Sequence, residues 1–139
     1  MLECIEPNLV VRRLADVDQD SLAARGIEAV LLDLDNTVCE WQSEAISPEC
    51  EDWILRAKER FRLAIVSNSI RPRRLNRVAQ RLGIAAVGRW GLGRKPMPGG
   101  IRAALREVDT PPNAAVIIGD QLFCDVLGGN CLGLYTVWV

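Results

Sequence analysis

Five short apolar runs that alternate with helical patterns limit what this chain of 139 residues can fold into. The runs cover residues 29–34, 63–66, 84–87, 115–118 and 134–139. Such runs, rich in aliphatic and β-branched residues, are typical of strands buried on both faces of a parallel sheet. Strands that alternate with helices predict an α/β fold. We expect a doubly wound, mostly parallel, five-stranded sheet with helices on both faces in three α/β/α layers.

The segments between the runs carry helix signals. Ser47 and Pro48 suit the N-cap and first turn of a helix that reaches residue 60, and Gly83 suits the end of a helix that starts near Pro72. Apolar residues between 9 and 25 recur with a loose helical period that ends at Gly26, so a helix is expected there too. Residues 101–108 and 122–127 predict two further helices, the second followed by a Gly-Gly pair.

Polar side chains follow four of these segments on the same side of the predicted sheet. They are Asp33 and Asp35 after the first strand, Ser67 and Asn68 after the second, Lys95 in the loop beyond the third, and Asp120 with Asp125 after the fourth. The carboxyl ends of parallel strands lie along one edge of a sheet, where open α/β folds bind ligands. Several carboxylates with a lysine and a hydroxyl at one edge predict a Mg²⁺ site beside a pocket for an oxyanion.

The sequence Asp33-Leu34-Asp35-Asn36-Thr37 is the centre of this arrangement. Two carboxylates two residues apart on an extended chain point the same way, and they repel unless a cation or a proton lies between them. Taken alone, the pentapeptide also suits a turn or a helix cap. The other three segments favour the site over the turn.

Composition excludes several other functions. The chain has no histidine, so common zinc sites and histidine-based triads are excluded or disfavoured, and its five cysteines lack metal-ligand spacing. No apolar run reaches the roughly 18 residues that a membrane span needs, and no leader pattern opens the chain, so we expect a cytoplasmic protein. The length fits one domain, residues 1–139.

Charge is distributed unevenly along the chain. Residues 1–60 carry 14 acidic and 6 basic side chains, whereas residues 61–139 carry 4 and 11. Arg73, Arg77 and Arg81 share one helix face, which is either a solvated surface or an electropositive rim for an anionic substrate or lipid headgroup. The second interpretation predicts peripheral contact with an anionic membrane. No nucleic-acid partner is expected.

The motif order resembles a known family. Asp-x-Asp-x-Thr, Ser-Asn, Lys-Pro and Gly-Asp-x-x-x-x-Asp, in that order, resemble the haloacid dehalogenase superfamily of phosphohydrolases, which have a Rossmann-like core. Residues 119–123 with Asp125, and the Gly-Gly-Asn at 128–130, resemble its capless subfamily IIIA. That branch includes phosphatidylglycerophosphate phosphatases. The likeness extends from about Leu9 to the end of the chain.

The resemblance implies a role for each motif residue. Asp33 would attack phosphorus and form an aspartyl phosphate, and Asp35 would protonate the leaving oxygen and then activate water. Mg²⁺ would be held by the Asp33 carboxylate, the Asp35 backbone carbonyl and Asp120. Ser67 and the Asn68 amide would hold the phosphoryl oxygens. Lys95 and the metal would offset the charge repulsion between nucleophile and phosphoryl group and keep Asp33 ionised. Thr37 would brace the turn that aims Asp35, and Asp125 would support the metal waters or Lys95.

Two positions depart from the family pattern. Cys124 stands where a threonine is expected, and Cys131 stands where a basic residue is expected. The first loses a hydroxyl and the second a cation, and both thiols are expected to be packed rather than reactive because no histidine could activate them. Relatives continue past the final strand, so a shortened C-terminus is an alternative. No segment is long enough for a lid, and Trp41 is either a flap over the crevice or a surface residue.

The favoured function is a Mg²⁺-dependent phosphomonoester hydrolase with phosphatidylglycerophosphate as its substrate. A phosphatase of a soluble metabolite, such as a nucleotide or sugar phosphate, is the nearest alternative. A receiver-like phospho-aspartate switch also places acidic residues, a hydroxyl and a lysine around Mg²⁺. However, a receiver carries its phosphorylated aspartate after the third strand, where this chain has Gly88 and Arg89.

Overall fold

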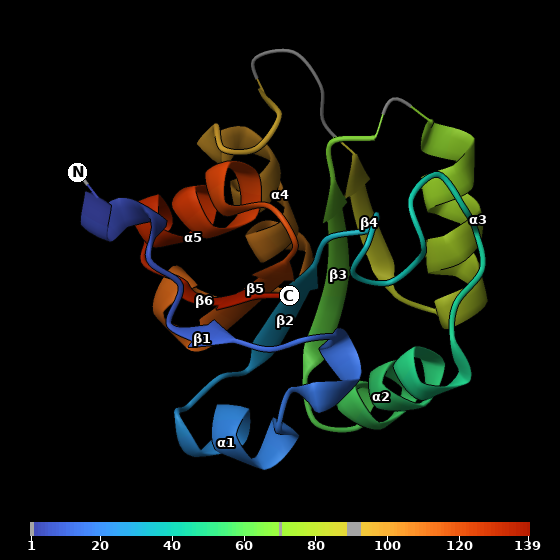
Figure 1. Ribbon diagram of the computed structural model, residues 1–139, viewed down its shortest axis with the longest axis horizontal. Coiled ribbons are helices and arrows are strands. Elements are labelled where there is room, and N and C mark those ends of the chain that lie inside the picture. The colour runs from blue at the N-terminus through green and yellow to red at the C-terminus, as the bar shows by residue number, and fades with distance from the viewer. Residues whose placement is uncertain (1, 70, 89–92) are drawn as a thin grey trace.

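A computed structural model describes residues 2–69, 71–88 and 93–139 (Figure 1). Its centre is one sheet of parallel strands in the order β1-β6-β5-β2-β3-β4. The strands are β1 Leu9–Val10, β2 Ala29–Leu32, β3 Arg62–Ser67, β4 Ala85–Gly88, β5 Ala115–Gly119 and β6 Tyr135–Trp138. The α/β class and the parallel, doubly wound sheet are confirmed. The predicted strand count was one too low, because β1 was not foreseen.

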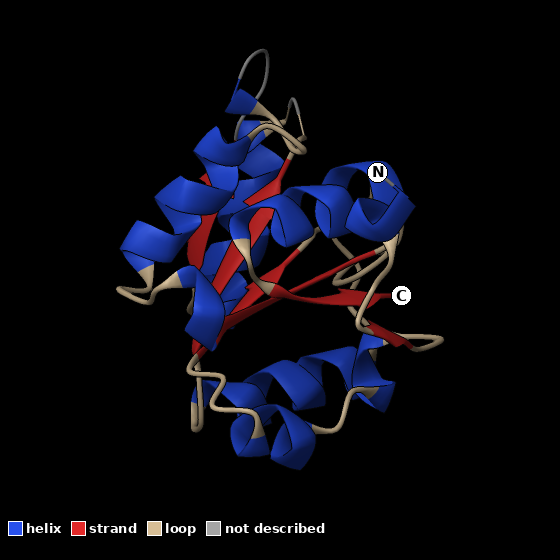
Figure 2. Ribbon diagram, turned by 90° about the vertical axis from the view of Figure 1, so that its left-hand side faces the viewer, coloured by secondary structure: helices blue, strands red, loops and turns tan. Residues whose placement is uncertain are grey.

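Helices cover both faces of the sheet, as Figure 2 shows. They are α1 Gln19–Ala24, α2 Pro48–Lys58, α3 Pro72–Leu82, α4 Pro98–Glu107 and α5 Leu127–Leu132, joined by short helical turns that include Leu14–Asp16 and Leu122–Val126. Successive residues of β2 point to opposite faces, so Leu32 packs in the cluster that holds Trp53 of α2, whereas Leu31 packs in the one that holds Ile101 of α4. This makes three layers, and no second domain covers them in the described part of the chain.

The helix predicted over residues 9–25 is wrong in its first half. Leu9 and Val10 pair with Val137 and Trp138 of β6, and α1 begins only after Asp18, whose carboxylate accepts a hydrogen bond from the Asp20 backbone N–H at 3.0 Å. The helical period was therefore loose because it joined an edge strand to a short helix. A two-residue strand has no periodicity of its own and depends on its distant partner.

Two predicted helix ends are confirmed, whereas the Gly-Gly pair lies in a different place from the one expected. Ser47 caps α2 by accepting from the Cys50 backbone N–H at 3.1 Å, and Gly83 ends α3 with a φ of 67°, as predicted. Gly128 and Gly129, expected to follow a helix, lie inside α5. A Cβ at Gly129 would stand 2.4 Å from Cγ2 of Ile117 in β5, so Gly129 lets α5 approach the sheet. A Cβ at Gly128 would stand 2.9 Å from Cδ1 of Ile101, so Gly128 lets α5 approach α4.

The predicted loop at 89–100 is only partly described. Residues 89–92 lie outside the described residues, and α4 begins at Pro98, earlier than the predicted residue 101.

Strand order places the site. The sheet grows from β2 through β3 to β4 on one side and through β5 to β6 on the other, so the direction of winding changes between β2 and β5. Leu32 pairs in register with Ile65 of β3 and with Ile118 of β5. The carboxyl ends of all three strands therefore lie at one edge, at the switch point where open α/β sheets bind ligands.

Candidate active site

Lys95 lies at the centre of this edge and binds two carboxylates. Its Nζ donates to Asp33 Oδ1 at 2.8 Å and also to Asp125 Oδ1, and its side chain is only 2% exposed. Burial alone would lower the pKa of Lys95, but the ion pairs with Asp33 and Asp125 raise it above its ordinary value. The lysine is therefore a permanently charged group that joins two acids from different strands.

Asn68 holds the backbone of Lys95 in place. Its side-chain Nδ2 donates to the Lys95 carbonyl at 2.9 Å, and its Oδ1 accepts from the Lys95 N–H at 2.7 Å. The side-chain amide of Asn68 is thus occupied with positioning. Phosphoryl binding by Asn68 stays a prediction.

Asp33, Asp120 and Asp125 form an acidic cluster. One oxygen from each lies within 4.8 Å of the others, although the three come from two distant segments of the chain. Asn36 donates to Asp120 Oδ2 at 3.2 Å, whereas Asp120 Oδ1 is buried and has no hydrogen-bond partner among the described residues. An all-oxygen cluster with a buried free acceptor suits a hard divalent cation such as Mg²⁺.

The expectation that Lys95 and the metal together keep Asp33 ionised stays a prediction, and Lys95 alone does not offset the effect of burial on the pKa of Asp33. Burial raises its pKa above the ordinary value, and the neighbouring Lys95 lowers it only in part. Burial also raises the pKa of Asp125, to about 6, again against the effect of Lys95. Without a bound metal, Asp33 and Asp125 therefore hold a proton more tightly than a free aspartate does. A cation at Asp33 and Asp120 would reverse this, because it stabilises the charged form.

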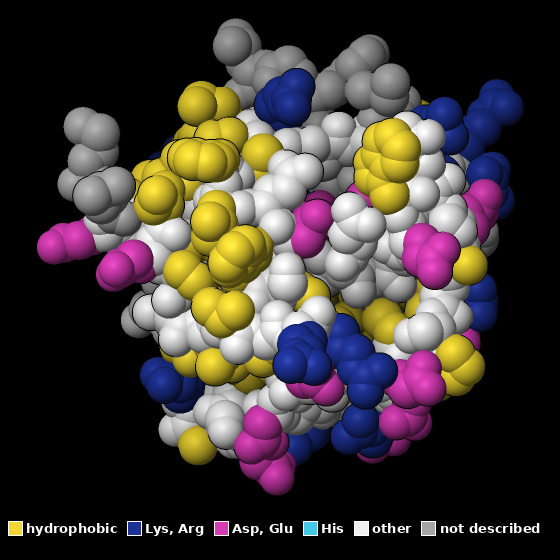
Figure 3. Space-filling view, viewed as in Figure 1, with side chains coloured by type: hydrophobic (Ala, Val, Ile, Leu, Met, Phe, Trp, Pro, Cys, Tyr) yellow, Lys and Arg dark blue, Asp and Glu magenta, His cyan; other side chains and the backbone are white. Residues whose placement is uncertain are grey.

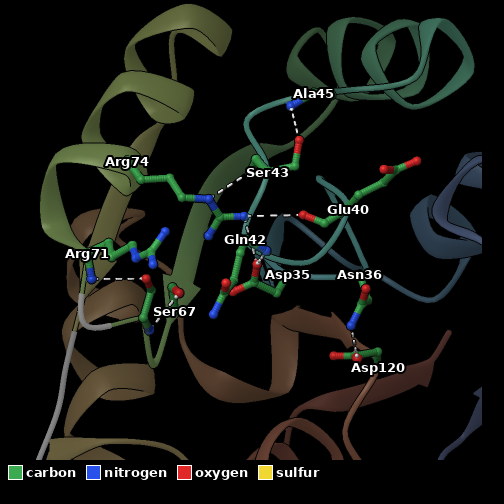
Figure 4. A network of polar contacts seen from close by, with 11 residues as sticks. Asp35, Asn36, Glu40, Gln42, Ser43, Ala45, Ser67, Arg71, Arg74 and Asp120 are labelled. Atoms are coloured by element: carbon green, nitrogen blue, oxygen red, sulfur yellow. Dashed lines mark hydrogen bonds and ion pairs between the residues drawn. The ribbon is translucent and has the colours of Figure 1, made fainter.

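The Asp35 carboxylate is held by α3 and by the connector between β2 and α2. Its Oδ1 accepts from Arg74 Nη2 at 2.7 Å and from the Gln42 backbone N–H at 2.8 Å (Figure 4). Arg74 also donates to the Ser43 carbonyl at 2.7 Å and to the Glu40 carbonyl at 3.4 Å. The arginine therefore ties α3 to the connector and to the predicted acid/base residue.

Arg74 was not predicted as a site residue, although its spacing from apolar residues in the sequence marks it. Arg74, Val78 and Leu82 recur every four residues, and Val78 and Leu82 are buried. A basic residue on the apolar face of a helix needs a buried partner, which marks it as different from the exposed Arg73 beside it.

Ser67 and Thr37 are both buried at this edge. Ser67 Oγ accepts from the Ser69 backbone N–H at 3.0 Å. The hydroxyl of Thr37 has no hydrogen-bond partner in the described residues, so the turn after Asp35 is not braced through it. Arg74 and the Gln42 N–H brace Asp35 instead.

A crevice of about 220 Å³ opens over these residues. Six of the eight predicted site residues line it, namely Asp33, Asp35, Ser67, Asn68, Lys95 and Asp125. Trp41, Arg94 and Cys124 line it as well, so Trp41 stands at the crevice, although 66% of it is exposed. Arg94, which sequence analysis did not single out, adds a cation beside Lys95.

The cysteine predictions are half right. Cys124 is partly buried at the crevice, and burial raises the pKa of its thiol, so it is a poor nucleophile. Cys131 is exposed, which contradicts its predicted packing.

Charge pairing weakens the predicted basic rim. Arg77 makes a bidentate pair with Glu44 at 2.8 Å, and Arg81 pairs with Glu51 at 3.1 Å. Two of the three arginines predicted to share a helix face, Arg77 and Arg81, are thus partly neutralised, which favours the interpretation of this face as a solvated surface. None of the helices in the described ranges has the length and apolar character that crossing a membrane requires.

Comparisons with known proteins give a family and a fold. A family profile described as mitochondrial PGP phosphatase matches residues 2–139. A Bacillus subtilis (strain 168) protein named "Probable phosphatase YqeG" is 34% identical over 134 residues, which cover 96% of this chain and 76% of that protein.

Two solved structures resemble the fold. A HAD phosphatase from Thermococcus onnurineus has a TM-score of 0.66 at 17% identity, over 81% of this chain and 86% of that one. An uncharacterized protein from Listeria monocytogenes serotype 4b has a TM-score of 0.66 at 19% identity, over 81% and 78%. At such identities the likeness concerns the fold alone.

Proposed function

Since this chain belongs to the mitochondrial PGP phosphatase family and is a haloacid dehalogenase-type hydrolase of phosphomonoesters, we propose that it works through an aspartyl phosphate on Asp33, requires Mg²⁺, and favours phosphatidylglycerophosphate. The observation that carries the proposal is the position of Lys95. It binds Asp33 and Asp125 at the same strand edge where Asp120 comes within 4.8 Å of both. In this proposal, residues 1–139 form one phosphatase domain.

The metal would be held by Asp33, Asp120 and the backbone carbonyl of Asp35. When bound there, Mg²⁺ would offset negative charge on the phosphoryl oxygens and on the nucleophile. Asp125 lies close enough to contribute through water or through Oδ2, which also accepts from the Gln121 backbone N–H at 3.2 Å, while its Oδ1 accepts from Lys95. The buried, unpaired oxygen of Asp120 is the group in greatest need of such a partner.

Each remaining residue has a task that its position supports. Asp33 Oδ attacks phosphorus in line with the leaving oxygen, and the bond from phosphorus to that oxygen breaks. Lys95 neutralises charge between nucleophile and phosphoryl group, and Ser67 binds a phosphoryl oxygen. Asp35 gives its proton to the leaving oxygen and later takes one from the water that cleaves the aspartyl phosphate.

The shape of the site supports a large substrate. The crevice holds little more than a phosphoryl group and its nearest atoms, and no domain covers it in the described part of the chain. A phosphate on a bulky or membrane-bound molecule could therefore reach Asp33.

Phosphate release from a substrate panel tests the proposal. We expect Mg²⁺-dependent release that is lost in EDTA and in Asp33→Asn, with phosphatidylglycerophosphate preferred over nucleotide and sugar phosphates. Asp52→Asn, a change at an exposed aspartate on α2, is the matched control and should keep full activity. Preference for a soluble phosphate would support the alternative substrate class. Full activity in EDTA would overturn the metal requirement.

A further inference from the structure

A second hollow lies beside the catalytic crevice. Its volume is about 410 Å³, larger than the crevice and within the range of small-molecule sites. We call it the side cavity. Its apolar lining comes from three segments and comprises Leu14, Ala15, Val38, Cys39, Ala45, Ile46 and Cys50. Figure 3 shows a hollow with hydrophobic side chains on its floor and Lys or Arg side chains along its lower edge, in front of the connector.

The side cavity adjoins the crevice through one residue. Asn36 lines both hollows, directly follows Asp35, and donates to Asp120. The turn that separates them is tight, because the Asn36 N–H donates to the Cys39 carbonyl at 2.7 Å. A molecule whose phosphate contacts Asp33 would therefore need to pass only Asn36 to reach the apolar floor.

The chemistry of the floor suits hydrocarbon. Burial raises the pKa values of Cys39 and Cys50 to about 11, so both thiols are neutral and act as small apolar groups. The Cys50 thiol donates its one S–H to the Val38 carbonyl at 3.5 Å, so it has no further hydrogen to donate to a ligand. The exposed lining residues include Arg13, Glu40 and Ser47, which carry groups of both charge signs. We therefore expect the apolar floor, and not a net charge, to determine which ligands the side cavity binds.

We propose that the side cavity binds the hydrocarbon part of the substrate's leaving group while the phosphate occupies the crevice. This inference rests on the proposed function, and it makes the enzyme selective for amphiphilic phosphomonoesters. The binding energy comes from moving apolar surface out of water, and each buried methylene raises affinity by about two- to fourfold. One protein molecule would thus bind the phosphate of a lipid in the crevice and its hydrocarbon in the side cavity, without any need for a bilayer surface.

An alkyl phosphate series tests the side cavity. With substrates kept monomeric, kcat/KM for decyl phosphate should exceed that for ethyl phosphate by at least about thirtyfold. Ala15→Trp, which fills the cavity, should reduce this ratio at least about tenfold. Ala45→Trp places the same bulk on the other wall, from an exposed position, and should act in the same direction. Ala23→Trp, at an exposed position on α1, is the control and should keep the wild-type ratio.

Failure of the inference differs from failure of the proposed function. Equal kcat/KM for the two substrates in the wild-type protein would overturn the inference while leaving the phosphatase intact, and so would an unchanged ratio in both cavity variants. No hydrolysis of any monoester would overturn the proposed function instead. In that case, calorimetric binding of decyl and ethyl phosphate to wild type and Ala15→Trp still decides the cavity, because tighter decyl binding that Ala15→Trp removes would support it. Equal binding in both proteins would contradict it.

Discussion

Arg74 Nη2 lies 2.7 Å from Oδ1 of Asp35, and this ion pair joins α3 to the predicted acid/base residue of the site. The arginine side chain is 5% exposed and the aspartate side chain 27%. Because Arg74 also binds the carbonyls of Ser43 and Glu40, it fixes the connector that carries Trp41. Asp35 is thus positioned by α3 and by the Gln42 backbone N–H of the connector.

Loss of this pair should slow the chemical step. We expect Arg74→Met to lower kcat by about ten- to a hundredfold, because misplacing an acid/base residue by an ångström costs that much. The exposed Arg73→Met on the same helix is the control. Steady-state kinetics on a small phosphomonoester provide the measurement. Equal kcat values in the two variants would show that Arg74 does not position Asp35 for catalysis.

Lys95→Met should abolish turnover and destabilise the fold. Without the lysine, Asp33 and Asp125 face each other in a buried site, and breaking a buried ion pair costs about 3–5 kcal/mol. Adding Asp125→Asn removes one of the two charges, so the double variant should recover part of the loss. Chemical denaturation of the four proteins in a mutant cycle measures the coupling. Additive changes would contradict a direct interaction.

Stability of the metal-free protein should depend on pH through Asp125. Its pKa rises from 3.8 to about 6 on folding, so the folded state binds its proton more tightly than the unfolded state. The resulting stabilisation is complete below 3.8 and is lost as pH rises through about 6. Wild type should therefore lose roughly 1–3 kcal/mol over this range relative to Asp125→Asn. Urea unfolding in EDTA at several pH values measures the difference, and a constant difference would disprove the assignment.

Gly119→Ala should displace Asp125. A Cβ at Gly119 would stand 2.1 Å from Asp125 Oδ2, closer than any real contact, so the carboxylate must move. We expect activity to fall by about a hundredfold or more. Gly99→Ala in α4 would bring its Cβ only to 3.4 Å from the Gly93 Cα, and it should keep its activity. Kinetics of the two variants, checked by thermal melting, give the comparison. Retained activity in Gly119→Ala would show that Asp125 has another place to go.

Sequence reasoning succeeded where the determinant was local. Buried strands have a continuous apolar signal, and a parallel sheet sends every strand's carboxyl end to one edge, so Asp33, Asp120 and Lys95 could be grouped without coordinates. The caps at Ser47 and Gly83 are local as well. These features need only spacing and the chemistry of single residues.

Prediction from the sequence failed where a structural feature depends on a residue far away in the chain. β1 exists because β6 pairs with it, and the Gly128-Gly129 pair serves the packing of α5 on α4 and on β5 rather than the end of a helix. The same holds for the bond between the Asn68 side chain and the Lys95 backbone, which lie 27 residues apart. The raised pKa of Asp33 follows from burial, which depends on the whole fold.

The central claim is that Asp33 takes the phosphoryl group and passes it to water. Acid quenching during turnover with Mg²⁺, followed by mass spectrometry of the peptides, tests it directly. The account predicts a phosphorylated peptide that maps to Asp33 and is absent from Asp33→Asn, which should release no phosphate. Phosphate on another residue, or normal release by Asp33→Asn, would contradict it.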